Sequence, residues 1–328
     1  MTAQAYIQSR LDGLSASQGL PKPANDDELA EAIFKIVMSK KYRKYSVPEE
    51  LAGKFKEAIR YDIEKGQPIN VTFVHGAYKL WRLDESPEPD WAELFSAIYY
   101  TNWLRGICEI YPPGVWFDYF VDDLIVPKLN NIPLEDVETY LECYRKLIVF
   151  LGPYQPDNFK MTVTGVGEQF ASPAAFDKKL AEDIKKYAAD FPSGFPEVTE
   201  VRSAMVELNA KPLAGVTDKP EWKAENVLMH DAYIKLTKAG TGYHYQPGKI
   251  LAFNQPLPVA IGVGTTRGSI AKFWAGVGAL KPKDGADFSQ VILSPKQLQD
   301  AAFHWEDVHI EGLQGKNFSK VRVLKPKL

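Results

Sequence analysis

The chain has 328 residues, a formal net charge of −3, 45% apolar residues and 25% charged residues. This is the balance of an ordinary globular protein, and it excludes a disordered or fibrous chain. A slightly acidic chain has no overall attraction for nucleic acid or for an anionic membrane, so any anion site must be local. The length allows one large domain or two.

The cysteine content and the start of the chain narrow the class of protein further. The two cysteines, Cys108 and Cys143, are too few for a zinc cluster or an iron–sulfur cluster, and both thiols are expected to be reduced. The first residues lack a basic segment followed by an apolar one, and no run approaches the ~18 apolar residues of a membrane span. We therefore expect a soluble cytoplasmic protein.

Residues 1–66 predict an N-terminal arm followed by a helical layer. Up to about Asp26 the chain is rich in Ser, Gly, Pro and Gln without a clear period, which predicts a loosely ordered arm. From Asp27 the apolar residues lie on one helical face, and a second helix is predicted from Pro48. Basic residues at 40–44 follow the first of these helices; cations stabilise a helix end, and this explanation is favoured over a nucleic-acid patch.

Residues 67–328 predict an α/β core in which short apolar strands alternate with helices. This alternation favours a Rossmann-like, mostly parallel sheet with helices on both faces. Further strands near the C-terminus would make the sheet mixed if hairpins connect them. We expect one compact domain overall. The predicted strands are 69–74, 115–121, 160–164 and, near the end of the chain, 290–293, 308–313 and 320–324, and the helices between the first three are 89–110 and 134–150.

The middle of the chain predicts two further helices, at about 175–190 and 221–238, with the Pro-rich segment 192–220 mainly connecting them. His230 and Asp231 are adjacent on the second of these helices, so their side chains point about 100° apart. They do not form the i, i+4 pair that a metal site on a helix needs, and a structural role for His230 is favoured.

A charged loop with several aromatic residues follows strand 69–74, and we expect it to be functional. It carries Lys79 and Arg82, and Asp122 and Asp123 close the next strand. In an open α/β sheet, ligands bind outside the carboxyl ends of the strands, so these groups are expected along one edge. Aromatic residues among the charges favour a partly buried site. The alternative is a solvated crossover loop.

A second informative stretch follows the apolar run 259–263, which predicts a further buried strand. Thr266, Arg267, Ser269 and Lys272 supply hydroxyls and cations, and glycines between them let backbone amides approach a ligand, as in a phosphate or carboxylate cradle. A glycine-rich hairpin is the alternative. The G-x-G-x-x-G and G-x-x-x-x-G-K-[ST] fingerprints are missing, which disfavours a nicotinamide or P-loop nucleotide site.

Three segments carry a resemblance to a known enzyme family. Pro89-Asp90-Trp91-Ala92-Glu93 resembles a P-D-x-G-E segment at the start of a helix, and Y-P-P-G at 111–114, with the strand ending in Asp122-Asp123, resembles a P-G and S-D-G pair. The stretch 259–272 lies where that family has a strand with an Arg and a later Lys. Together these segments resemble the isocyanide (isonitrile) synthases related to the pyoverdine/paerucumarin and dityrosine biosynthesis proteins.

The sequence also departs from the family pattern. Ala92 replaces a glycine, Leu80-Trp81-Arg82 replace a Ser/Asn-rich loop, and no histidine follows Arg267 where the family has R-L-S-I-H-P. Membership can therefore hold while the substrate or the reaction differs.

The resemblance implies an enzyme that joins an amino acid's amine to the ketone of ribulose 5-phosphate and breaks the sugar down to leave an isonitrile carbon. Such chemistry needs acid/base groups and a phosphate clamp. It implies small-molecule substrates and a downstream oxygenase in the pathway, with no metal or other cofactor, no nucleic acid and no membrane. The expected catalytic residues are Lys79, Glu93 and His244, and the expected substrate-binding residues are Arg82, Asp90, Asp122, Thr266, Arg267, Ser269 and Lys272.

Two other classes of function stay open. In a non-catalytic binding module the same cations would hold an anionic metabolite, and the carboxylates would merely pair with Lys79 and Arg82. An iron-dependent oxygenase would use His244 with Asp or Glu, but no H-x-D spacing supports it. The isonitrile-synthase-like enzyme and the binding module are distinguished by whether Lys79, Glu93 and Arg267 face one pocket.

Overall fold

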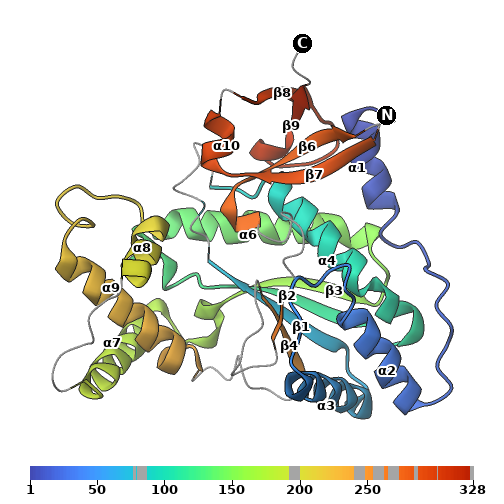
Figure 1. Ribbon diagram of the computed structural model, residues 1–328, viewed down its shortest axis with the longest axis horizontal. Helices are drawn as coiled ribbons and strands as arrows, with labels where there is room; N and C mark the ends of the chain where they lie inside the picture. The colour runs from blue at the N-terminus through green and yellow to red at the C-terminus, as the bar shows by residue number, and fades with distance from the viewer. Residues whose placement is uncertain are drawn as a thin grey trace.

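The computed structural model describes residues 1–76, 79, 87–191, 200–239, 248–253, 262–264, 273–283, 287–300 and 302–325. Figure 1 shows a central sheet with helices packed around it and a second, smaller sheet at one end of the molecule, beside both chain termini. None of the helices within these residues is long and apolar enough to cross a membrane.

The larger sheet has five strands in the order β3-β2-β1-β4-β5, and every pairing in it is parallel. β1, β2 and β3 are in register and end level with one another, at His75, Val121 and Gly165. The three predicted parallel strands are confirmed, and β4 was not predicted. Of the strand predicted at 259–263, the last two residues belong to β5, and 259–261 lie outside the described residues. The strands are β1 Ile69–His75, β2 Val115–Val121, β3 Phe159–Gly165, β4 Lys249–Phe253 and β5 Gly262–Gly264.

Helices cover both faces of this sheet, as predicted. On one face, Phe73 and Phe117 pack in one cluster with residues of α4 (Trp91–Ile110) and α6 (Leu134–Leu151). On the other face, Val74 packs with residues of α7 (Pro173–Ala189) and with Tyr233. Because side chains alternate along a strand and both faces are covered, these strands carry nearly continuous apolar runs. The remaining helices near the sheet are α2 Asp26–Val37, α3 Glu49–Lys65, α5 Val126–Asn130, α8 Glu200–Asn209 and α9 Pro220–Ala232, which continues into a π-helical turn, Tyr233–Thr237.

Two segments predicted to lack regular structure contain helices. The arm expected up to Asp26 contains α1, Ala3–Asp12, whose Tyr6, Ile7 and Leu11 are buried. This helix is only weakly amphipathic, and its order comes from packing against the second sheet, where the Tyr6 ring lies 5.4 Å from that of Phe288. The connection expected at 192–220 likewise contains α8.

The C-terminal strands form a sheet of their own instead of extending the larger one. Its order is β7-β6-β9-β8, with antiparallel β6–β7 and β8–β9 pairs and a parallel β6–β9 pair. In the described residues no strand of this sheet pairs with the larger sheet, because β6 packs over α4 instead of against an edge strand. The strands are β6 Val277–Lys283, β7 Asp287–Leu293, β8 His304–His309 and β9 Lys320–Lys325, and α10 spans Pro295–Gln299.

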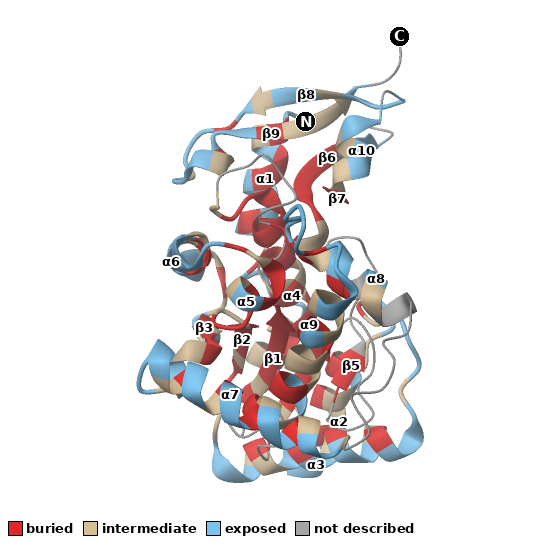
Figure 2. Ribbon diagram, turned by 90° about the vertical axis from the view of Figure 1, so that its left-hand side faces the viewer, coloured by how far each residue is buried: buried red, intermediate tan, exposed pale blue. Residues whose placement is uncertain are grey.

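Helix α4 lies between the two sheets, and most of its residues are buried (Figure 2). Trp91, Leu94, Phe95 and Ile98 of this helix belong to the same core cluster as Leu280 of β6. The position of α4 therefore depends on both sheets. This dependence matters for the functional site, because the site is built around the N-terminus of α4.

Candidate functional site

Lys79, which follows β1, is buried and pairs with two carboxylates. Its side chain is 4% exposed, and its ammonium forms ion pairs with Asp90, at 3.2 Å, and with Glu93. Both carboxylates belong to the N-terminus of α4. The structure thus brings together three of the residues predicted for the site, Lys79, Asp90 and Glu93.

The P-D-x-x-E segment begins α4 with a reciprocal capping box. The Asp90 carboxylate accepts a hydrogen bond from the Ala92 amide at 2.6 Å, and the Glu93 carboxylate accepts one from the Asp90 amide at 2.9 Å. Such a box satisfies two N–H groups that have no partner within the helix. The same two carboxylates that start the helix also face Lys79, so this segment has a structural role whatever its part in catalysis.

Glu93 is fully buried and is shared between Lys79 and α6. Its Oε1 atom also accepts a hydrogen bond from the Tyr140 hydroxyl at 2.9 Å. Burial raises the pKa of Glu93 to about 7, although Lys79 opposes this shift. Burial alone would lower the pKa of Lys79, but Asp90 and Glu93 outweigh it and raise that pKa. The lysine is therefore a fixed cation, and Glu93 is the group of the pair that can exchange a proton near neutral pH.

His75, the last residue of β1, lies in an aromatic enclosure and is 5% exposed. Its Nδ1 atom lies 3.3 Å from the Gly76 carbonyl, and its Nε2 atom has no hydrogen-bond partner among the described residues. Burial lowers the pKa of His75 to about 4, so the ring is neutral at physiological pH. No role was predicted for this residue, although its place directly after a strand was a signal. The rings around it, at 4.8 to 6.4 Å, are those of Phe273, Tyr119, Tyr144, Phe73 and Tyr140.

Asp122 stands at the end of the neighbouring strand β2 and is linked to a second buried lysine. Its amide donates to the His75 carbonyl at 3.1 Å, and its carboxylate accepts hydrogen bonds from Tyr233 and from Lys238. Lys238 is 1% exposed, and burial lowers its pKa against the opposing effect of Asp122. His75 interacts electrostatically with Asp122, Lys79 and Lys238. The edge of the sheet therefore carries two buried lysine–carboxylate groups, both within electrostatic reach of one histidine.

This edge is the topological switch point of the larger sheet. From β1 the chain proceeds through β2 to β3 on one side, and it then returns to place β4 on the other side of β1. In open α/β sheets the crevice at such a point, outside the carboxyl ends of the strands, is where ligands bind. The expectation that function lies after the first predicted strand agrees with this topology.

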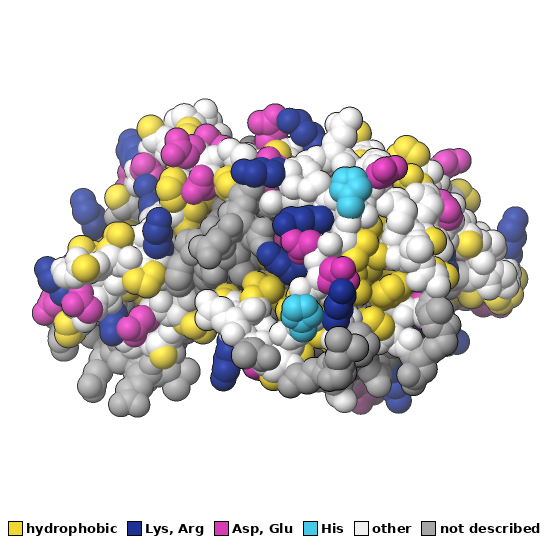
Figure 3. Space-filling model, turned by 90° about the horizontal axis from the view of Figure 1, so that it is seen from above, with side chains coloured by type: hydrophobic (Ala, Val, Ile, Leu, Met, Phe, Trp, Pro, Cys, Tyr) yellow, Lys and Arg dark blue, Asp and Glu magenta, His cyan; other side chains and the backbone are white. Residues whose placement is uncertain are grey.

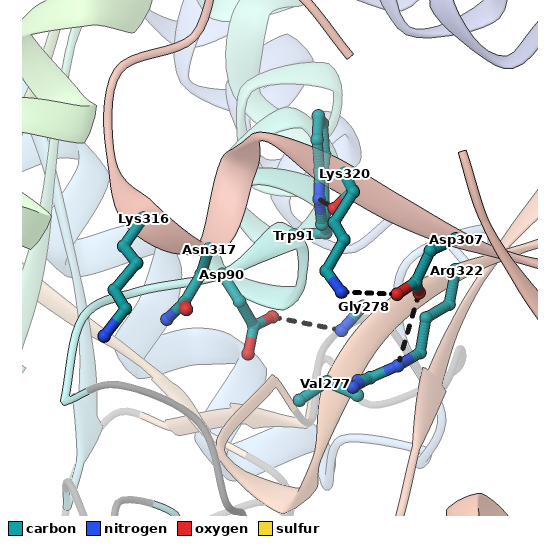
Figure 4. Close-up of a pocket in the computed structure, with 9 residues that line it drawn as sticks. All are labelled: Asp90, Trp91, Val277, Gly278, Asp307, Lys316, Asn317, Lys320 and Arg322. Carbon is teal, nitrogen blue, oxygen red and sulfur yellow. Dashed lines mark hydrogen bonds and ion pairs between the residues drawn. The ribbon is translucent and has the colours of Figure 1, made fainter. Parts of the chain in front are cut away.

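The second sheet contacts the N-terminus of α4 and so helps to position Asp90. The Gly278 amide of β6 donates to the Asp90 carboxylate at 3.0 Å, and the Trp91 indole donates to the Lys320 carbonyl of β9 at 2.7 Å. Figure 4 shows Asp90 directed at Gly278, and Lys320 and Arg322 directed at Asp307. The cavity between these residues has a volume of about 60 Å³, which is too small for an amino acid or a sugar phosphate.

Two larger cavities are not lined by the residues of the lysine–carboxylate groups. One, of about 390 Å³, lies between α6 and the segment before β9, and the other, of about 460 Å³, lies between residues 20–23 and α2. Neither is lined by Lys79, Glu93 or Asp122. On the face above the second sheet, acidic and basic side chains are interspersed and do not form a patch of one sign (Figure 3).

The other predicted site residues are only partly accounted for. Both oxygens of Asp90 already bind the protein's own groups, through Ala92, Gly278 and Lys79. The substrate-binding role of Asp90 stays a prediction. Among the described side chains, no group of three His, Cys, Asp or Glu is placed to hold a metal ion. Outside the described residues lie Arg82, His244, Thr266, Arg267, Ser269 and Lys272.

Lys238 and Tyr233 were missed at the sequence level. They lie 116 and 111 residues from Asp122. Nothing in the helical pattern of 221–238 distinguishes these two residues from surface and core positions.

The fold is similar to that of a protein of known structure. No protein-family model and no curated protein sequence matches this chain. The crystal structure of the PvcA protein from Pseudomonas aeruginosa is similar to it, with a TM-score of 0.62 over 90% of this chain and 100% of that one, at 15% sequence identity. The chain therefore has the fold of the PvcA protein, in agreement with the remote family resemblance of its sequence.

Proposed function

We propose that the protein is a biosynthetic enzyme that condenses the amine of an amino acid with ribulose 5-phosphate to form an isonitrile or a related C–N product. Its sequence resembles the isocyanide synthases at three segments, and it shares the fold of the PvcA protein. The observation that carries the proposal is the buried group of Lys79, Asp90 and Glu93 at the carboxyl edge of the sheet. The family resemblance implies acid/base roles for Lys79 and Glu93 and a substrate-binding role for Asp90.

The chemistry of this group fits the steps of such a reaction. Imine formation releases the ketone oxygen as water, which requires a proton donor, and the next step requires a base for a proton on carbon beside the C=N bond. A carboxyl whose pKa is raised to about 7 is partly ionised at neutral pH, and Glu93, which is such a group, serves as that base in its ionised form. Lys79, held as a cation, stabilises negative charge that develops on an oxygen or on that carbon.

Burial of the group also suits an imine intermediate. Lys79 and Glu93 are 3% and 0% exposed, so bulk water is largely excluded from them. Exclusion of water protects reactive intermediates from hydrolysis and strengthens electrostatic interactions. In this proposal Arg267, Ser269 and Lys272, with Thr266, bind the phosphate, Arg82 binds the carboxylate, and His244 is an additional base.

The test is to incubate the protein with single amino acids and ribulose 5-phosphate and to analyse the products by mass spectrometry. An isonitrile adds one carbon to the amino acid's nitrogen, and ¹³C at the ketone carbon of the sugar should appear in the product. Glu93→Gln keeps the size of the side chain and an oxygen for the Asp90 amide, and we expect it to lower turnover by about 10²–10⁴-fold. If no amino acid yields a labelled product, the proposed reaction is wrong.

A binding module for an anionic metabolite remains the second candidate, because one observation favours it. The charges of Lys79, Asp90 and Glu93 satisfy one another and the start of α4, which is what a purely structural group would do. In that case Glu93→Gln would change the stability of the protein, and the protein would bind pentose phosphates without converting them.

A further inference from the structure

Within the described residues, the carboxylate of Asp122 is held through one of its two oxygens. Oδ1 accepts hydrogen bonds from the Tyr233 hydroxyl, at 2.6 Å, and from the Lys238 ammonium, at 2.5 Å. Oδ2 accepts none within the part of the chain that the structure describes. The side chain is 16% exposed, in contrast to the 1% of Lys238. The carboxylate is thus fixed on its inner side and open on its outer side.

The π-helical turn explains how two residues of one helix reach the same oxygen. In an α-helix, residues five apart point about 140° away from each other. Here the Lys238 amide donates to the Tyr233 carbonyl at 2.8 Å, and this i to i+5 bond brings the two side chains back to one side. Single π turns of this kind occur frequently at functional sites.

Further contacts fix this turn against the rest of the protein. The Thr237 hydroxyl donates to Asp183 of α7 at 2.8 Å. The Lys238 ammonium lies 5.5 Å from the centre of the Phe120 ring and 5.6 Å from that of Tyr233, so its cation is also stabilised by aromatic faces. Tyr233 and Lys238 therefore form a rigid support for Asp122, which a solvated ion pair would not.

The open oxygen lies at the edge where the substrate is proposed to bind. Asp122 follows β2 directly and bonds the His75 carbonyl through its amide, and Lys79 acts electrostatically on the same histidine. Because Lys238 already balances the charge of Asp122, a ligand at Oδ2 need not be a cation. It must be a hydrogen-bond donor, since an ionised carboxylate only accepts.

We infer that Tyr233 and Lys238 are positioning residues that hold Asp122 so that its Oδ2 atom accepts a hydrogen bond from a hydroxyl or amine group of the substrate. This inference rests on the proposed function and deepens it. A sugar hydroxyl and an amino acid's amine both have the required chemistry, so the two substrates are tested separately.

The experiment is calorimetric titration of the full-length protein with ribulose 5-phosphate alone and with single amino acids alone. Tyr233→Phe and Lys238→Met should each weaken binding of one of the two probes by about ten-fold and leave the other unchanged. Lys235→Met is the matched control, because Lys235 lies in the same turn but donates to the Tyr187 hydroxyl. Thermal unfolding of each variant establishes that folded proteins are compared.

A double-mutant cycle tests whether Tyr233 acts through Asp122. Asp122→Asn keeps an oxygen for Tyr233 and places an NH₂ group where Oδ2 was, so it should weaken binding of the same probe. Adding Tyr233→Phe to Asp122→Asn should then have little further effect on that binding. The inference would be overturned if Tyr233→Phe weakened binding equally with and without Asp122→Asn. It would also be overturned if Tyr233→Phe and Lys238→Met bound both probes as tightly as wild type.

Failure of the inference and failure of the proposed function are distinguishable. If the protein forms the C–N product while Asp122→Asn binds both probes normally, the positioning role is wrong and the reaction stands. If wild-type protein binds a probe through Asp122 without forming any C–N product, the reaction is wrong and the positioning role stands.

Discussion

Burial has opposite effects on the charge states of the residues around β1. It leaves His75 neutral, it leaves Lys79 charged because two carboxylates accompany it, and it moves the pKa of Glu93 to about 7. Environments that separate the pKa values of neighbouring groups are typical of acid/base sites. The Tyr140 hydroxyl donates a hydrogen bond to Glu93, so a change at Tyr140 can test this separation of pKa values.

Tyr140→Phe should move the pH dependence of turnover. As a base, Glu93 acts in its ionised form, so wild-type turnover should rise as the pH passes through about 7. The Tyr140 hydroxyl stabilises that ionised form, and its removal should raise the pKa of Glu93 and shift the rise to higher pH. The measurement is kcat against pH, with Tyr154→Phe as the control, because Tyr154 is a partly exposed tyrosine of the short 3-10 turn Gly152–Tyr154. An unchanged profile would mean that the rise does not come from Glu93.

Asp62 should make the stability of the protein depend on pH. This fully buried carboxyl accepts hydrogen bonds from Gln67 and from the Asn70 amide, and burial raises its pKa from 3.8 to about 7. A raised folded-state pKa means that its stabilising effect is complete below pH 3.8 and is lost as the pH rises through about 7. The free energy of unfolding should therefore fall by on the order of 2 kcal/mol between pH 5 and pH 8.

The variant Asp62→Asn cannot ionise and should remove most of that pH dependence. Its overall stability should also be lower, because the amide cannot accept both hydrogen bonds. Urea unfolding of wild type and variant at several pH values measures the difference in slope. Parallel curves for the two proteins would exclude Asp62 as the titrating group.

At the scale of the element, α4 shows how the sequence determines both a helix and a site. Its P-D-x-x-E start is recognisable as a helix N-terminus from sequence, and so is its long apolar run. What the sequence does not show is that β6 approaches this N-terminus. A Cβ atom on Gly278 would overlap the backbone of Trp91 and Ala92, so only glycine allows this contact.

Gly278→Ala should therefore destabilise the protein and disturb the site together. Overpacking of this kind typically costs ~1–3 kcal/mol, and the Gly278 hydrogen bond to Asp90 would be strained as well. Gly53→Ala in α3 is the control: nothing lies within 4 Å of the added Cβ, and the helix should be stabilised by ~0.5–1 kcal/mol. Chemical denaturation measures both. A Gly278→Ala protein as stable as wild type would mean that β6 can move away from α4.

The elements that sequence analysis missed share one property. Strands β1 to β3 and helices α4 and α6 are predictable because each carries a long, local apolar pattern. By contrast, α1 depends on packing against β7, and β4 is a five-residue strand flanked by glycine and polar residues. The pairing of Asp122 with Lys238 depends on a π turn, which has no sequence signature. Tertiary contacts, not local preference, determine these features.

At the scale of the whole molecule, the two sheets share one core. Leu280, Ile292 and Val321 of the second sheet belong to the cluster that also contains Phe73 and Phe117 of the larger sheet. Among the described residues, the cluster confined to the second sheet has Val277, Ala279 and Leu293 as its only buried members. Such a small cluster cannot offset the conformational entropy of ordering four strands by itself.

We therefore expect the two sheets to unfold in one transition. Helix α4 is the shared element, so its loss would expose the apolar faces of both sheets at once. Hydrogen exchange measured by mass spectrometry under native conditions should give peptides of β6 and peptides of β1 the same opening free energy. The equilibrium unfolding curves measured by circular dichroism and by tryptophan fluorescence should coincide. If β6 and β9 exchange at a clearly lower free energy than β1 and β2, the second sheet is a separate cooperative unit. In that case the second sheet could unfold while the residues around Lys79 stay ordered, and Asp90 would lose its hydrogen bond from Gly278 in that state. The site would then depend on the second sheet only in part.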